Sequence, residues 1–213
     1  MESLRPCTQL YISVDAPTAD ELKAVDRPLF SDFWERFLAC VDLLREKKQR
    51  TVFRLTLVNG WNTQQLGKYV ELIRRANPDF VEVKGVTYCG DSKASPLTIK
   101  HCPYHAEVRA YCKAMVDELG AGSGYALASE HAHSNIVLIA RDAFKLNGAW
   151  HTWIDYDKFA ALATAGEPFG ALDYCAPTPQ WAVYDEQAAD GGFDPGETRF
   201  ARKNGQMRVT NGC

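Results

Sequence analysis

The feature that most constrains the fold is an alternation of strand-like and helix-like segments over the first 85 residues. Residues 8–14, 51–58 and 80–83 are short runs rich in β-branched and aromatic side chains. The stretches 33–44 and 66–73 carry apolar residues at every third or fourth position, which is typical of one helix face. Crossovers of this length join parallel strands. The segment is therefore predicted to be a parallel α/β sheet or a piece of a barrel.

The strand expected at residues 8–14 has apolar residues on both faces, although it is the first strand of the chain. A strand of this kind normally has neighbours on both sides. We therefore expect that further strands precede it in the complete fold, and that this chain supplies only part of the sheet.

The regular pattern loosens after residue 85. A long connection follows over residues 85–103, rich in Gly, Ser, Pro and Lys, and connections of that length are usually functional or mobile. Beyond it the sequence predicts a helix over 104–119, strands over 125–128 and 135–140, a hairpin that turns at Asn147-Gly148, and a short helix over 156–163. Residues 166–213 are rich in Pro and Gly and are expected to form an irregular tail.

The composition narrows the class of protein. Apolar residues make up 46% and charged residues 24%, and the net charge is −3, so there is no overall basic signature of a nucleic-acid-binding protein. The seven cysteines are scattered without a CxxC pair, which favours free thiols in a reducing, cytoplasmic compartment. No secretory signal is evident, and no run approaches the roughly 18 apolar residues that a membrane span needs. We expect no membrane partner.

Six motifs together indicate a family. They are RLTLVNGWN (54–62), DFVEVKGVTYCGDS (79–92), SEHAHSNIVLIA (129–140), NGAWHTWIDYDKF (147–159), TPQWAVY (178–184) and GGFDPGETR (191–199). In this order and at similar spacing they resemble the tRNA 4-demethylwyosine synthases of the wybutosine pathway. The resemblance covers the chain from about residue 8 to its end.

This resemblance implies a radical S-adenosylmethionine (SAM) enzyme built on a partial (βα)6 TIM-like barrel. Family members bind a 4Fe–4S cluster through a CxxxCxxC loop and use SAM as their second cofactor. They are carbon–carbon lyases that condense N1-methylguanosine, beside the anticodon of tRNA(Phe), with carbons of pyruvate. Eukaryotic members also carry an FMN domain ahead of the barrel.

The chain departs from the family at the cluster, because it contains no CxxxCxxC motif. We therefore expect a C-terminal portion: residues 1–98 as the last barrel strands, 99–165 as a wyosine-specific α+β extension, and 166–213 as the tail. Such a chain is expected to be inactive alone. Two alternatives remain: a catalytically incompetent tRNA-binding module, and an unrelated TIM-barrel lyase or metal hydrolase that uses His131 and His133.

Polar residues at the ends of the first two strands are candidates for binding SAM or substrate, because ligands collect at the carboxyl ends of parallel strands. They are Ser13, Asp15, Arg54, Thr56 and Asn59. Arg54 and Thr56 share one strand face, and an arginine there suits a carboxylate or phosphate. The alternatives are that Asp15 only caps its turn and that Arg54 lies on a solvent-facing edge. Asn59 stands where the family suggests a basic residue, which puts an anion contact there in doubt.

Three further candidates surround the third strand. Glu82 and Lys84 share one face and either contact substrate or simply pair with each other, and Tyr88 could stack on a tRNA base. The pair His131 and His133 lies on one strand face, yet no third ligand has a fixed spacing from it, so no metal site is predicted.

A basic cluster near the C-terminus could contact tRNA phosphates, although a solvated terminus is equally consistent with its composition. Its members are Arg199, Arg202, Lys203 and Arg208.

Overall fold

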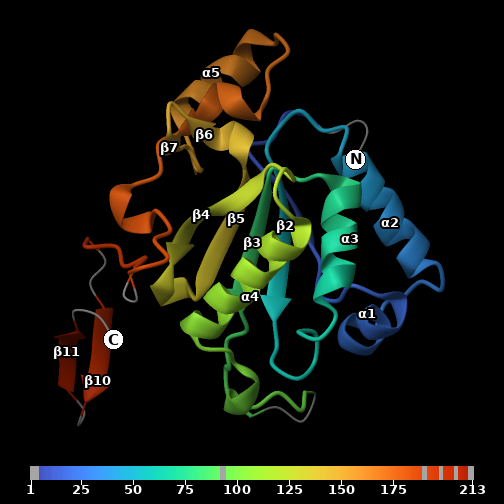
Figure 1. Cartoon of the computed structure of the whole chain (residues 1–213), viewed down its shortest axis with the longest axis vertical. Coiled ribbons are helices and arrows are strands. Elements are labelled where there is room, and N and C mark those ends of the chain that lie inside the picture. The colour runs from blue at the N-terminus through green and yellow to red at the C-terminus, as the bar shows by residue number, and fades with distance from the viewer. Residues whose placement is uncertain (1–4, 92–94, 189–190, 197–198, 204–205, 211–213) are drawn as a thin grey trace.

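A mixed sheet of five strands lies at the centre of the structure, in the order β1-β2-β3-β5-β4 (Figure 1). The structure is a computed structural model that describes residues 5–91, 95–188, 191–196, 199–203 and 206–210. The strands of the sheet are β1 (Leu10–Ser13), β2 (Thr51–Leu57), β3 (Phe80–Gly85), β4 (Tyr125–His131) and β5 (Ile136–Arg141).

The first three strands are parallel, as the β–α–β–α–β pattern predicts, and β5 runs antiparallel to both β3 and β4. The α/β class is therefore confirmed, with an antiparallel pair in the region expected to be an α+β extension. β1 forms one edge of the sheet, and within the described part of the chain it pairs with β2 alone.

Three helices cover one face of the sheet (Figure 1). They are α2 (Phe33–Leu44), α3 (Leu66–Ala76) and α4 (His105–Leu119). Their apolar residues pack on every second side chain of the strands, including Phe53, Leu55 and Val83, to form the main hydrophobic core. Burial of this apolar area is the largest stabilising contribution in a fold of this kind.

A short helix, α1 (Ala19–Asp26), follows β1 and is not predicted by the periodicity. Only Leu22 among its residues is buried, so the sequence has no apolar stripe to reveal it. Its start is set by Thr18, whose hydroxyl accepts a hydrogen bond from the backbone N–H of Glu21 at 3.4 Å.

On the opposite face of the sheet, apolar residues are buried at the amino ends of the parallel strands. There Val52, Phe80 and Ala140 pack against Phe144 and Trp150 in a second, smaller core. Trp150 belongs to the hairpin of β6 (Lys145–Leu146) and β7 (Ala149–Trp150), which turns through Asn147 and Gly148, both with positive φ, as the sequence predicts. The helix α5 (Tyr156–Ala165) lies beyond this hairpin (Figure 1).

The tail is more regular than its composition suggests. β9 (Cys175–Ala176) pairs with β8 (Trp153–Ile154), and β10 (Arg199–Lys203) forms an antiparallel hairpin with β11 (Gln206–Thr210). The expectation of an irregular segment from residue 166 is therefore wrong for these parts. Pairing between distant segments, such as β8 with β9, leaves no local periodicity in the sequence. Among the described residues, no helix has the length and apolar character that crossing a membrane requires.

Candidate substrate-binding face of the sheet

The alternation of side chains along β2 and β3 separates the core from a polar face. Phe53, Leu55 and Leu57 point toward the helices, so Arg54 and Thr56 point to the helix-free face. The register pairs Arg54 with Glu82 and Thr56 with Lys84, and paired residues on adjacent strands share a face. We call these four residues, together with Tyr11 and Ser13 of β1, the polar rows. The first row consists of Tyr11, Ser13, Arg54 and Glu82, and the second row of Thr56 and Lys84.

The first polar row contains an ordered ion pair. Arg54 Nε lies 3.0 Å from Glu82 Oε1, and the Tyr11 hydroxyl donates to Glu82 Oε2 at 3.1 Å. The guanidinium carbon also lies 5.8 Å from the centre of the Tyr11 ring. Burial, followed by the Glu82 charge, raises the pKa of Tyr11 to about 12, so its hydroxyl remains a donor at neutral pH. Tyr11 carries no signal in the sequence, since it pairs with Glu82 across 71 positions.

The side chain of Arg54 is paired with Glu82 but remains partly exposed to solvent. Its side chain is 43% exposed, whereas that of Glu82 is 14% exposed. An arginine has five N–H donors in a planar fork, and the ion pair with Glu82 is made through Nε. The sequence also allowed Arg54 to be a solvent-facing edge residue: β2 lies inside the sheet between β1 and β3, so Arg54 is not on an edge strand, and its role in binding stays a prediction.

The second polar row continues across the sheet toward β4. Ile136 pairs with both Lys84 and His131, which places the histidine on the same face as the lysine. The His131 ring centre lies 5.6 Å from that of Trp181, and Nδ1 lies 2.7 Å from Ser134 Oγ. Trp181 belongs to the TPQWAVY motif, which the sequence singled out without assigning it a role.

The other predicted residues divide between this face and its surroundings. Ser13 pairs with Arg54 and is exposed on the face. Asp15 follows β1, where burial and then Asp26 raise the pKa of its carboxyl group while Arg54 lowers it. The structure therefore brings Ser13, Asp15, Arg54, Thr56, Glu82 and Lys84 to one end of one face.

Asn59 and Tyr88 lie at the border of the site. The Asn59 side-chain amide donates to Glu107 of α4 at 3.3 Å, so this side chain contacts the helix layer. Tyr88 lines a cavity of about 480 Å³ together with Lys84, His133 and Ser134, and its hydroxyl donates to Asp91 at 2.6 Å. A base that stacked on Tyr88 would thus lie beside Lys84.

The basic residues of the tail can be placed only by backbone. Arg199, Arg202 and Lys203 belong to β10 and Arg208 to β11, but their side chains lie outside the described part of the structure. Their proposed contact with tRNA stays a prediction.

Glu130 is a buried carboxylate that faces away from the two histidines beside it in the sequence. Its Oε2 lies 2.9 Å from His105 Nε2 and 3.5 Å from Arg109 Nε, both of α4. Gly191 and Gly192 pack directly against it, where a Cβ atom would clash. Glu130 therefore holds the GGFDP segment against β4 and α4, and it is not a partner of His131 or His133.

The described residues do not contain a ligand set for a metal or for an iron–sulfur cluster. No group of three or more His, Cys, Asp or Glu side chains converges in this part of the chain. Six cysteines are free thiols, and burial raises the pKa of Cys112 and Cys175, which disfavours the thiolate form that a cluster requires. A 4Fe–4S cluster does not fit these residues.

Comparison with known proteins agrees with the motifs. A family model described as "Wyosine base formation" matches residues 75–141. The S-adenosyl-L-methionine-dependent tRNA 4-demethylwyosine synthase of Oryza sativa subsp. japonica is 54% identical over 204 residues, covering 95% of this chain and 31% of that protein. The Homo sapiens protein of the same name, TYW1, is 49% identical over 219 residues, covering 100% of this chain and 29% of its own length.

Two solved structures of related proteins are also similar to this chain. "Structure of TYW1 with a lysine-pyruvate adduct bound" aligns with a TM-score of 0.57 at 30% identity, over 67% of this chain and 43% of the other. An archaeal TYW1 crystal structure aligns with a TM-score of 0.50 at 30% identity, over 66% and 42%. The chain spans about 30% of the length of the curated relatives it matches, and by its sequence it belongs to the tRNA 4-demethylwyosine synthase family.

Proposed function

We propose that this chain acts as part of a tRNA 4-demethylwyosine synthase, which condenses N1-methylguanosine in tRNA(Phe) with carbons of pyruvate by radical SAM chemistry in the cytoplasm. Similarity along nearly the whole chain supports the proposal. We further propose that residues 1–98 supply barrel strands, that 99–165 form the wyosine-specific region, and that the FMN domain and the cluster ligands belong to the remainder of the enzyme.

The observation that carries the proposal is the polar face of an otherwise apolar sheet. Arg54 lies midway along β2 and Lys84 near the carboxyl end of the adjacent strand β3, and the ion pair with Glu82 fixes the guanidinium in place. Pyruvate, the amino-acid part of SAM and the tRNA backbone all present anionic oxygens. A fixed guanidinium binds such groups with little loss of side-chain freedom.

Under this proposal the residues of the face orient reactants. Arg54 binds a carboxylate or phosphate, and Lys84 adds a second positive charge at the next position of β3. Ser13 and Asp15 supply a hydroxyl and a carboxyl group near SAM, which when bound provides the radical that starts the reaction. No step is assigned to the cluster, since its ligands are not among the described residues.

The test uses Arg54→Ala in the full-length enzyme. We predict at least a hundredfold loss of 4-demethylwyosine formation from N1-methylguanosine-containing tRNA(Phe), because charge-assisted positioning of a reactant is lost. Nucleoside mass spectrometry measures the product, and the unfolding midpoint checks that the barrel survives. Arg45→Ala is the matched control: it removes the same charge at an exposed position after α2 and should leave product formation unchanged. Wild-type product from Arg54→Ala would remove Arg54 from the site.

A second candidate is a catalytically incompetent tRNA-binding module. The absence of a cluster ligand set among the described residues favours it for the isolated chain. The two candidates differ in one outcome, because only the first predicts that adding the rest of the enzyme restores SAM cleavage.

A further inference from the structure

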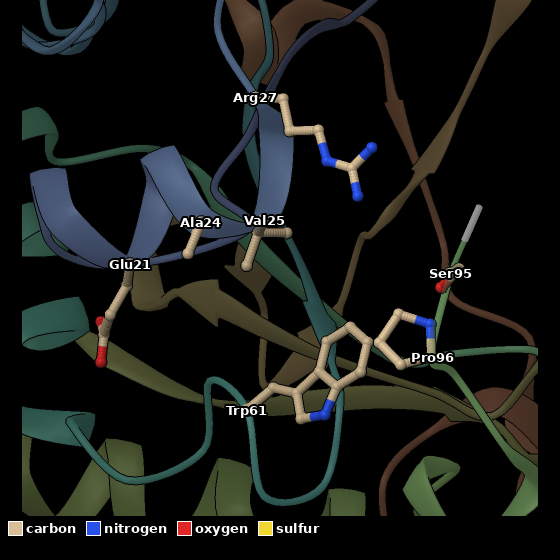
Figure 2. A pocket seen from close by; sticks show the side chains of 7 residues that line it. All are labelled: Glu21, Ala24, Val25, Arg27, Trp61, Ser95 and Pro96. Atoms are coloured by element: carbon tan, nitrogen blue, oxygen red, sulfur yellow. The ribbon is translucent and has the colours of Figure 1, made fainter. Parts of the chain in front are cut away.

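A cavity of about 610 Å³ is lined in part by residues that follow β1 and β2 in the chain (Figure 2). Its walls come from α1, from the loop after β2 and from the segment before α4; the lining residues are Glu21, Ala24, Val25, Arg27, Trp61, Ser95 and Pro96. We propose that this cavity binds one unpaired nucleotide of RNA, with the base stacked on Trp61 and its phosphate at Arg27. The inference rests on the proposed function, from which it takes RNA as the substrate class.

Trp61 is a fixed aromatic surface. Its side chain is partly exposed, and its ring centre lies 5.2 Å from the ring of His101, which supports it from one side. The next residue, Asn62, is buried and makes three hydrogen bonds: Oδ1 accepts from Val58 N at 2.9 Å, and Nδ2 donates to the carbonyls of Thr56 and Asp15 at 2.8 Å. A loop pinned in this way presents the indole without further loss of freedom on binding.

Arg27 supplies an unused positive charge at the same cavity. It ends α1 in the left-handed conformation, with φ of 49°, and Figure 2 shows its guanidinium extending away from the helix on the cavity side. Its guanidinium has no hydrogen bond or ion pair with any described residue, whereas Arg36 and Arg75 are paired with Asp32 and Asp42. An unpaired guanidinium on a cavity wall suits a phosphate.

The remaining walls fit a nucleobase. Val25 and Pro96 contribute apolar surface near the indole, and Ser95 adds a hydroxyl that can meet a base edge (Figure 2). The one carboxylate of the lining, Glu21, lies away from Arg27 and already accepts from Thr18 Oγ1 and from Gln65 Nε2 at 3.1 and 2.7 Å. Stacking on an aromatic ring with a nearby cation is the usual way in which proteins hold single-stranded RNA.

The experiment measures the affinity of the 213-residue chain for a fluorescent single-stranded oligoribonucleotide and for unmodified tRNA(Phe), over a series of salt concentrations. Trp61→Ala should weaken binding roughly tenfold without changing the salt dependence, since stacking is uncharged. Trp61→Phe should restore most of the affinity. Arg27→Ala should weaken binding and lower the slope of log K against log salt by about one, and Arg27→Lys should restore that slope.

Matched controls lie at the other end of the molecule. Tyr156→Ala removes an aromatic ring that is 65% exposed at the start of α5, and Arg45→Ala removes an exposed arginine after α2. Both should bind RNA as the wild type does. The unfolding midpoint of each variant shows that lost affinity does not reflect lost structure.

Three outcomes overturn the inference. If Trp61→Ala and Arg27→Ala bind RNA as the wild type does, the cavity is not the nucleotide site, although the proposed function stands. If Trp61→Ala loses affinity for SAM but not for RNA, the cavity belongs to the cofactor. If the wild-type chain binds neither RNA, the inference is wrong, and the RNA affinity of the full-length enzyme then decides whether the proposed function is wrong as well.

Discussion

Arg50 is a buried cation that joins the start of β2 to the segment before α5. Only 5% of its surface is exposed, and its guanidinium donates to Gln9 Oε1 and to the backbone carbonyls of Thr152 and Trp153. The guanidinium carbon also lies 4.0 Å from the centre of the Phe80 ring. Burial lowers the pKa of Arg50 to about 10, so the charge persists at neutral pH and its hydrogen bonds are charge-assisted.

We predict that Arg50→Met lowers the free energy of unfolding by about 3 kcal/mol, because the buried carbonyl of Thr152 and the partly buried carbonyl of Trp153 lose their donor while the apolar volume is kept. Urea denaturation measures the change. Arg45→Met is the control at an exposed position five residues earlier, and it should stay within about 0.5 kcal/mol of the wild type. An Arg50→Met protein as stable as the wild type would show that these contacts contribute nothing net.

The carboxyl group of Asp15 should make the free energy of unfolding depend on pH. Its carboxyl pKa is raised above 3.8 by burial, and the Asp26 charge adds to the rise. The folded state therefore holds this proton more tightly than the unfolded state does, so stability falls as pH rises from 3.8 through the folded pKa and stays lowered at pH 7. Asp15→Asn removes the titrating group. We predict a higher free energy of unfolding at pH 7, with the difference shrinking as the pH approaches 3.8.

Urea denaturation at a series of pH values checks this prediction. Asp20→Asn, an exposed carboxylate in the first turn of α1, is the comparison and should change stability by less than about 0.5 kcal/mol at each pH. Lower stability of Asp15→Asn at pH 7 would mean that the ionised carboxylate is instead stabilised in the fold. The same variant in the full-length enzyme tests whether this destabilising group is kept for catalysis.

Among the elements, the loop after β2 is set by one amide. Asn62 is 3% exposed, and its three hydrogen bonds join the end of β2 to the turn after β1. Asn62→Ala should lower the free energy of unfolding by about 2 kcal/mol, because a buried N–H and two carbonyls lose their partner. Asn59→Ala, in the same loop, loses only one long hydrogen bond to Glu107 and should change stability by less than about 0.5 kcal/mol. Equal effects of the two substitutions would contradict this assignment.

The elements that the sequence predicts correctly are those with a local signal. The strands β2 and β3 and the helices α2, α3 and α4 follow from apolar periodicity, and the β6–β7 hairpin follows from Asn147-Gly148. The polar rows follow from the same local rule, since a period of two places Arg54 with Thr56 and Glu82 with Lys84. The elements that the sequence does not predict have no such local signal. The helix α1 is too polar to show an apolar stripe, and the β8–β9 and β10–β11 pairs have no recognisable sequence pattern.

Contacts across elements explain the part of the site that the sequence could not predict. The Tyr11–Glu82 bond and the neighbouring His131 and Trp181 rings depend on register between strands far apart in the chain. The Trp61 and Arg27 cavity likewise joins a helix and a loop that share no motif. Glu130 directly precedes His131 in the sequence, yet strand alternation places its carboxylate on the opposite face of the sheet, beside His105 of α4.

At the scale of the whole molecule, the two faces of the sheet differ in where apolar and polar side chains lie. The helix-covered face holds the main core, and the second, smaller apolar core lies at the amino end of the other face. The polar rows, the Lys84–Tyr88 cavity and the Trp61 cavity all lie toward the carboxyl ends of the parallel strands. The apolar cores and the polar groups are therefore separated along the strands, so the polar groups gather without interrupting the core.

This separation leads to a prediction about the isolated chain. If the polar face binds substrates as proposed, a chain without a cluster ligand set among its described residues should bind RNA without starting radical chemistry. We predict that anaerobic reconstitution of the 213 residues with iron and sulfide yields no 4Fe–4S absorbance, and that SAM is not cleaved to 5′-deoxyadenosine. The free cysteines of the described chain do not converge, and burial disfavours the thiolate of Cys112.

The full-length enzyme, reconstituted in parallel, is the control, and it should give both signals. Mixing the chain with the remainder of the enzyme should restore 5′-deoxyadenosine formation if the polar face completes the site, and Arg54→Ala in the added chain should then reduce 4-demethylwyosine more than it reduces SAM cleavage. That ratio separates substrate positioning from cofactor binding, since a residue that holds only SAM would lower both products together. A brown, SAM-cleaving protein from the 213 residues alone would instead require that their cysteines rearrange to bind the cluster.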